Sequence, residues 1–298
     1  MNRRKNKLRK IIVWLRNAVY TILAIAIFSL VYVFQIEPQW FEVVSVDVSV
    51  PNLASAFNGF TIVQISDVHA DTSMNQRKLS KIVKLINRQQ PDIIAMTGDF
   101  VTIKADPQTY SLLEKTFKQF SPTEKTVGVL GNHDHWSDPN EIRQLLHEGK
   151  ALDLNNTVHI IERNNSKLAI AGVDDNWAGK SDLDAVLKQL ESQNNPPAIL
   201  LAHEPDFADV SAATHKFALQ ISGHSHGGQI RLRNRKNPPV LPRMAKKYPV
   251  GRYQVDGMVQ YTNRGVGMVS PAVRFNCRPE ITVFTLNSTD RVARSNTF

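Results

Sequence analysis

Five short segments of this chain combine aspartate, histidine and asparagine at spacings that suit metal binding. They read Asp67-Val68-His69, Gly98-Asp99, Gly131-Asn132-His133-Asp134, His203-Glu204 and Gly223-His224-Ser225-His226. Carboxylate, imidazole and amide groups are the oxygen and nitrogen ligands of borderline divalent metals. Two such metals held close together can polarise a phosphate ester and activate the water that attacks it. The residue types therefore predict a two-metal centre for phosphate ester hydrolysis.

Most of the five segments directly follow a short apolar run with strand propensity. The pattern predicts strands over residues 43–50, 60–65, 92–96, 126–130, 157–161, 167–173, 198–202 and 217–221. Apolar residues at helical spacing predict helices over 76–89, 108–120, 139–148 and 181–192. Residues 255–262 and 280–286 are expected to form antiparallel strands. The alternation indicates an α/β class with a largely parallel sheet in the first half, and ligands bind beyond the carboxyl ends of such strands.

An uncharged segment, residues 18–36, follows a strongly basic N-terminus. Residues 1–16 hold seven lysines or arginines and no acidic residue. With residues 11–15 upstream, the segment approaches the ~20 apolar residues that span a bilayer. We expect a basic tail at 1–10 and a single transmembrane anchor at 11–36. A cleaved signal peptide is less favoured because no small-residue cleavage site follows, and the basic block argues against a buried core helix.

The charge distribution bears on orientation and on domain boundaries. The positive-inside rule places the basic tail in the cytoplasm and the catalytic part outside it. Arg3-Arg4 also allows a twin-arginine signal, and a segment that enters only one leaflet would leave the domain cytoplasmic. We expect a linker and first strand at 37–58, the main domain at 59–290 and a tail at 291–298. Cys277 is the only cysteine, which excludes an internal disulfide and a thiolate cluster.

In their order along the chain, the five segments resemble the motifs D-x-H, G-D, G-N-H-[DE], H and G-H-x-H of the calcineurin-like metallophosphoesterase superfamily. The resemblance covers roughly residues 59–287 and implies a four-layer α/β-β/α sandwich, here with an N-terminal transmembrane helix. It implies that the ligands of the first metal are Asp67, His69 and His226, those of the second are Asn132, His203 and His224, and Asp99 bridges the two. Manganese is the first expectation for both ions, with iron or zinc as alternatives.

The resemblance also implies two catalytic residues that are not ligands. His133 would contact a phosphate oxygen or protonate the leaving oxygen, and Asp134 would bind the other ring nitrogen of His133. Three glycines, Gly98, Gly131 and Gly223, are expected where the chain turns sharply near the metals. His135 is expected to be an ordinary histidine, and residues 174–176 are expected to form a turn.

A second basic region begins directly after His226. Residues 229–278 hold eleven lysines or arginines against one acidic residue, Asp256. Three interpretations stay open for this region: contact with an anionic substrate, docking on anionic lipid headgroups beside the anchor, or a solvated loop. Its first eight cations are Arg231, Arg233, Arg235, Lys236, Arg243, Lys246, Lys247 and Arg252.

Together these features predict a membrane-anchored phosphohydrolase in which hydroxide between two metals attacks a phosphodiester or pyrophosphate bond. Thr262-Asn263-Arg264-Gly265 and Arg278-Pro279-Glu280 resemble a bacterial branch that includes enzymes cleaving UDP-2,3-diacylglucosamine in lipid A synthesis. That substrate is cytoplasmic, which conflicts with the outward orientation. The alternatives are a superfamily nuclease, a general phosphomonoesterase, and a non-enzymatic protein that binds membrane surfaces or nucleic acid. Nucleic acid is not expected as the substrate, because chromosomal DNA is not confined to a membrane.

Overall fold

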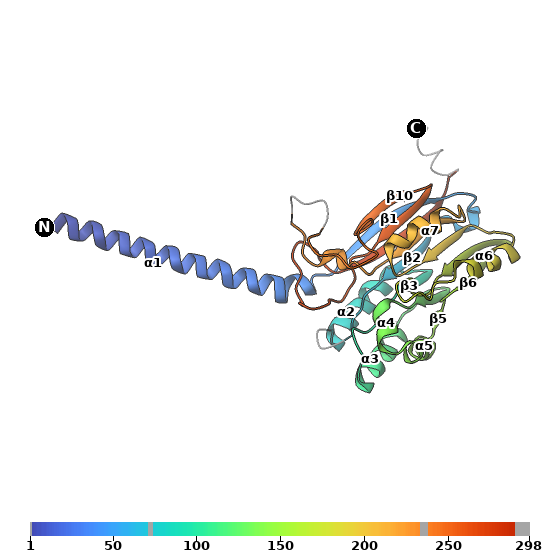
Figure 1. Cartoon of the computed structure of the whole chain (residues 1–298), viewed down its shortest axis with the longest axis horizontal. Coiled ribbons are helices and arrows are strands. Elements are labelled where there is room, and N and C mark those ends of the chain that lie inside the picture. Colours follow the sequence, from blue (N-terminus) through green and yellow to red (C-terminus); the bar gives the residue numbers. More distant parts are fainter. Residues whose placement is uncertain (1, 71–73, 233–237, 290–298) are drawn as a thin grey trace.

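Two six-stranded sheets lie face to face in the computed structural model, which describes residues 2–70, 74–232 and 238–289. The first sheet has the order β1 (Glu42–Val50), β12 (Glu280–Ser288), β2 (Phe60–Ile65), β3 (Ile93–Thr97), β4 (Lys125–Val129) and β5 (Ala151–Asp153). The second has the order β10 (Gly251–Val255), β11 (Met258–Thr262), β9 (Phe217–Ser222), β8 (Ala198–Leu201), β7 (Ser166–Gly172) and β6 (Thr157–Arg163). Figure 1 shows the sheets between outer helices.

Three apolar cores join the four layers. The central core lies between the sheets and includes Ile62 of β2 and Leu219 of β9. The next residue along β2, Val63, faces the opposite core under α2 (Gln76–Asn87), α3 (Pro107–Phe117) and α5 (Pro139–Glu148). A third core packs the second sheet against α6 (Leu183–Ser192) and α7 (Ala208–Ala212). Since side chains alternate across a strand, each sheet is buried on both faces. The expected four-layer sandwich is confirmed.

The C-terminal strands are only partly antiparallel, which corrects the expectation from the sequence. β10 pairs antiparallel with β11, and β12 pairs antiparallel with β2. However, β12 runs parallel to β1 and β11 runs parallel to β9. The reason is that β12 inserts between two strands of opposite direction, so it must be parallel to one of them. The helix expected over 108–120 ends at Phe117, and Asp138 caps α5 by accepting from the backbone N–H groups of Asn140 and Glu141.

The apolar N-terminal segment forms one long helix, α1 (Asn2–Val31), which projects away from the domain (Figure 1). With the turns Tyr32–Ile36 and Glu37–Gln39, it gives a helical stretch over Asn6–Gln39 that is long and apolar enough to cross a membrane. Its apolar side chains are exposed, so it is not a core helix. The expected tail at 291–298 lies outside the described residues.

The end of this helical stretch is attached to the domain by specific contacts. The backbone N–H of Arg274 donates to the Val33 carbonyl at 3.0 Å. The Glu37 side chain is fully buried and accepts from the backbone N–H of Cys277. Only Trp40 and Phe41 separate the last turn from β1, and β1 pairs with β12 along its whole length. The segment expected as a linker therefore includes an edge strand of the first sheet.

Candidate metal centre

The seven predicted ligands all lie just beyond strands, where the two sheets end side by side. Each strand ends in a tight turn, and five ligands adopt a positive φ: Asp67 (53°), His69 (43°), Asp99 (56°), His224 (68°) and His226 (51°). This left-handed backbone is uncommon for residues with a side chain and is concentrated at functional sites. All seven predicted ligands are buried. Buried carboxylates and imidazoles at such density require hydrogen bonds or bound cations.

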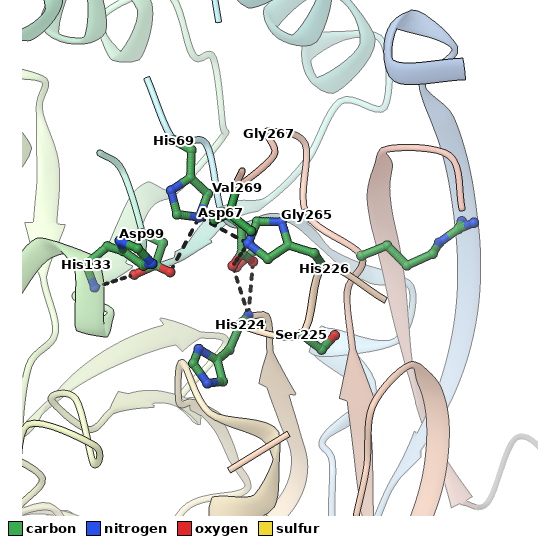
Figure 2. A network of polar contacts seen from close by, with 12 residues as sticks. Asp67, His69, Asp99, His133, His224, Ser225, His226, Gly265, Gly267 and Val269 are labelled. Carbon is green, nitrogen blue, oxygen red and sulfur yellow. Dashed lines mark hydrogen bonds and ion pairs between the residues drawn. The ribbon is translucent and has the colours of Figure 1, made fainter. Parts of the chain in front are cut away.

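The first cluster contains Asp67 and His69 after β2, Asp99 after β3 and His226 after β9. Their ligand atoms all lie within 4.8 Å of one another. His69 Nε2 lies 3.1 Å from His226 Nε2 and 3.5 Å from Asp99 Oδ2. His226 Nε2 lies 3.3 Å from Asp67 Oδ1. Figure 2 shows these four side chains pointing toward one another.

The second cluster shares Asp99 with the first and adds His203 and His224. His203 Nε2 lies 3.2 Å from Asp99 Oδ2 and 3.1 Å from His224 Nδ1. The other two ring nitrogens donate to backbone carbonyls, His203 Nδ1 to Thr97 and His224 Nε2 to Arg243, both at 2.7 Å. Because a carbonyl only accepts, these nitrogens carry the protons. Although burial opposes it, the neighbouring carboxylate of Asp99 raises the pKa of His203 well above its usual range. A cation that displaces the Nε2 proton of His203 would meet lone pairs from both rings at one point.

Electrostatics keep one histidine of each cluster, His226 and His224, suitable for metal binding. Burial and the neighbouring His203 lower the pKa of His224 to about 4. Burial and the neighbouring His69 hold the pKa of His226 well below its usual range. A neutral imidazole is the form that binds metals. The amide oxygen Oδ1 of Asn132 is buried without a hydrogen-bond partner, as expected for an oxygen that completes the second site.

Three predicted glycines lie where a side chain cannot be placed. A Cβ at Gly98 would lie 2.5 Å from the Gly131 nitrogen, and one at Gly131 would lie 2.4 Å from Asp99 Oδ1. A Cβ at Gly223 would lie 1.8 Å from the Ser66 hydroxyl oxygen. The glycines therefore let the strand ends approach closely enough for the ligands to meet.

The structure separates the predicted pair His133 and Asp134. The His133 Nδ1–H donates to the Thr102 carbonyl at 2.6 Å, and the half-buried ring borders the metal centre. Asp134 does not contact this ring, which corrects the expected hydrogen bond. Its carboxylate accepts from the backbone N–H groups of Asp99 (2.8 Å), Phe100 (2.9 Å) and Gly131 (2.9 Å). It lies in the first turn of α4 (Asn132–Ser137), where a carboxylate binds free N–H groups.

Several groups at the centre were not predicted from the sequence. Trp136 and Trp177 contact each other edge to face at 5.2 Å between ring centroids, and they flank His133 and His224. The backbone N–H of Trp177 donates to Glu204 Oε1 at 2.7 Å. His135, expected to be ordinary, donates Nε2–H to Asp174 at 2.6 Å. No local pattern marks these residues, because their partners come from distant loops.

A cavity of about 340 Å³ opens over the metal centre. Asp99, Asn132, His133, His224 and His226 form one side of it. Trp136, Trp177 and the segments 239–242 and 269–273 form much of the remainder. Within the described chain, no lysine or arginine lines the cavity. Lys247 instead pairs with Asp209 at 2.7 Å, and Arg252 donates to the Asp47 carbonyl at 2.8 Å. Arg233, Arg235 and Lys236 lie outside the described residues.

The fold and the two clusters define a metal-dependent phosphohydrolase. The chain belongs to the calcineurin-like phosphoesterase family, whose sequence model matches residues 60–228. It is 34% identical to the uncharacterized metallophosphoesterase YkuE of Bacillus subtilis over 87% of this chain and 90% of the relative. It is 29% identical to the phosphodiesterase YaeI of Escherichia coli over 86% of this chain and 92% of the relative. A Danio rerio transmembrane protein with a metallophosphoesterase domain is 28% identical over 89% of this chain and 62% of its own length.

Proposed function

We propose that this chain is a membrane-anchored phosphohydrolase that binds two metal ions and cleaves phosphodiester or pyrophosphate bonds. The observation that carries the proposal is Asp99, because its buried carboxylate belongs to both clusters of ligand atoms. A shared carboxylate would offset the repulsion between two dications held in neighbouring sites. When bound, the metals would polarise the phosphoryl group and lower the pKa of water at the centre.

The ligand assignment follows the two clusters. Asp67, His69 and His226 would hold the first metal, Asn132, His203 and His224 the second, and Asp99 both. Manganese is the preferred ion, with iron or zinc as alternatives, because nitrogen and oxygen ligands are mixed.

The remaining residues orient groups and move protons. With the Nδ1 of His133 bonded to the Thr102 carbonyl, its Nε2 is the nitrogen left for the substrate. A protonated His133 would donate Nε2–H to a phosphate oxygen or to the leaving oxygen. Asp134 would act as a positioning residue: it binds the Asp99 and Gly131 amides and so fixes the bridging carboxylate.

Membrane anchoring is supported by the exposed apolar helix and by its attachment to the domain. Residues 33–37 contact Arg274 and Cys277, so the segment after the helix contributes to the folded domain. A retained anchor explains these contacts better than a cleaved signal peptide. The seven cations of residues 1–16 favour a cytoplasmic N-terminus and an outward domain. A nucleotide-linked lipid substrate requires the opposite orientation.

The substrate is best tested with the full-length protein in lipid nanodiscs, loaded with Mn²⁺. Three compounds are compared: bis-p-nitrophenyl phosphate, p-nitrophenyl phosphate and UDP-2,3-diacylglucosamine. Selective cleavage of the lipid nucleotide supports a lipid A pyrophosphatase on the cytoplasmic face. Cleavage of the simple diester alone supports a general phosphodiesterase and is compatible with an outward domain. Preference for the monoester contradicts the proposal, and so does the absence of turnover with both metals bound. His147→Ala, on the exposed face of α5, is the matched control.

The alternatives have less support. A superfamily nuclease keeps the metals but gains nothing from a membrane anchor. A non-enzymatic binding protein has no use for two complete ligand clusters. Steep salt dependence of DNA binding without a metal requirement would favour that alternative.

A further inference from the structure

The cavity over the metal centre is bounded largely by apolar side chains from two loops. Val240, Leu241 and Pro242 come from the segment after the metal-binding turn, and Pro271 and Val273 come from the segment before Arg274. Gln229 fixes the second of these loops. Its amide Nε2 donates to the Val269 and Pro271 carbonyls at 3.1 and 3.0 Å, and its Oε1 accepts from the Val269 N–H at 2.7 Å. This wall of the cavity is therefore held in place by hydrogen bonds, although its apolar side chains offer few groups for hydrogen bonding to a ligand.

The same loops carry exposed apolar surface. Beyond residue 41, the described chain exposes seven large hydrophobic side chains, namely Ile103, Trp136, Leu152, Val210, Leu232, Val240 and Phe275. Trp136 and Val240 line the cavity itself, and Val240 is 74% exposed. Leu232 and Phe275 lie in the adjoining segments, which pair through Arg231 N–H to the Phe275 carbonyl at 2.9 Å. Two of the seven thus line the cavity and two more lie in segments next to it, and a gathering of exposed apolar side chains is typical of a binding site.

This opening is close to the end of the apolar helix. Val273 and Phe275 flank Arg274, whose backbone N–H binds the carbonyl of Val33 in the turn that follows α1. Figure 1 shows α1 reaching the domain beside loops of the C-terminal third of the chain. The loop that binds the end of this helical stretch therefore also forms part of the cavity wall. This continuity identifies a lipid chain, rather than a soluble partner, as the occupant that the wall fits.

We infer that the apolar cavity is a subsite for a hydrocarbon chain, and that the substrate is a phosphodiester or pyrophosphate of a membrane lipid. This inference rests on the proposed function. The phosphate would lie at the metal centre, and the adjoining methylenes would lie between Val240, Leu241 and Val273. At about 340 Å³, the cavity is near the small end of the range of about 300–1,000 Å³ for ligand sites. It accepts part of one chain, and the rest of the lipid stays in the bilayer.

The test uses p-nitrophenyl alkyl phosphates with methyl to octyl chains, hydrolysed by the Mn²⁺-loaded full-length protein in nanodiscs. We expect kcat/KM to rise by up to about fourfold per added methylene until the cavity is filled. This factor corresponds to the ~0.8 kcal/mol gained when one methylene is buried. Val240→Ser and Leu241→Ser should each reduce this slope. Val210→Ser, at an exposed apolar position on α7, should retain it.

Each result decides a different point. Equal turnover of the methyl and octyl diesters would overturn the chain subsite and leave the proposed function intact. If both serine variants keep the wild-type increase of kcat/KM per methylene, the alkyl chain binds elsewhere, and this result would also overturn the inference. No hydrolysis of any diester, including bis-p-nitrophenyl phosphate, would instead refute the proposed function. Thermal unfolding of each variant shows whether the fold is preserved.

Discussion

Replacement of Gly131 by alanine tests the bridging role of Asp99 without altering any ligand. The φ of Gly131 is −114°, so alanine fits the backbone there, and the added methyl group is the only perturbation. That methyl would lie 2.4 Å from Asp99 Oδ1, 2.7 Å from the His203 ring and 2.8 Å from the Asp99 nitrogen. Restoring an ordinary contact of 3.4 Å requires the carboxylate to shift by about 1 Å, and such a displacement costs on the order of 10²-fold in rate.

The assay is kcat/KM for bis-p-nitrophenyl phosphate, with metal content measured on the same sample. Gly131→Ala should lose about 10²-fold in kcat/KM and bind both metals more weakly, because Asp99 belongs to both clusters. Gly128→Ala is the matched control: its Cβ would meet only side-chain atoms, those of Leu146 at 3.3 Å and of Met96 at 3.5 and 3.6 Å. We expect the control to retain activity and metal. Wild-type kcat/KM and full metal content in Gly131→Ala would refute the bridging geometry.

Three further predictions concern the ligands, the proton donor and the contact between the sheets. Asp99→Ala should abolish hydrolysis and remove both metals, as measured by metal analysis after dialysis; retention of one metal would contradict a shared ligand. His133→Ala should lower turnover by about 10²–10⁴-fold while both metals stay bound, and equal metal loss in the two variants would refute its role. The Asp92 carboxylate binds the Arg163 guanidinium of the facing sheet at 2.8 Å. Burial raises the pKa of Asp92, but this ion pair and the hydrogen bonds to Thr61 and Thr123 outweigh it, so the pKa is lowered. The ionised Asp92 therefore stabilises the fold above its pKa in the unfolded chain, 3.8, and this stabilisation is lost as the pH falls through its lower pKa in the folded protein. Asp92→Asn should therefore lower the free energy of unfolding of the metal-free protein, measured in urea, by about 1–2 kcal/mol at pH 7 and by less at pH 3. An equal loss at both pH values would contradict the lowered pKa of Asp92.

The sequence predicted the strands that end at Asp67, Asp99 and Asn132 because strand ends and ligand motifs are local features. Apolar runs, glycines and the following aspartate or histidine lie within a few residues of one another. The parallel arrangement of these strands then brings their ends to one edge of the sheet. The fold class and the grouping of the ligands could therefore be predicted before the structure was known.

Features that depend on distant segments were missed. The parallel pairing of β1 with β12 joins residues more than two hundred positions apart, such as Val46 and Phe284, and no local period encodes it. Asp134 was assigned to the ring of its neighbour His133, whereas the helix turns its carboxylate toward the Asp99 and Gly131 amides. Three interpretations of the basic region were open from the sequence, and in its described part the apolar residues Val240 and Leu241 are the ones that line the cavity.

The short connection between the last helical turn, Glu37–Gln39, and β1 has a kinetic consequence. Two residues and a few hydrogen bonds leave the domain little freedom to rotate or to rise from the membrane in which we place α1. An enzyme held in this way samples substrate within a surface, so its rate depends on the mole fraction of substrate among the surrounding lipids. Diluting the membrane with inert lipid at constant bulk substrate should slow the reaction, whereas diluting the suspension with buffer should not.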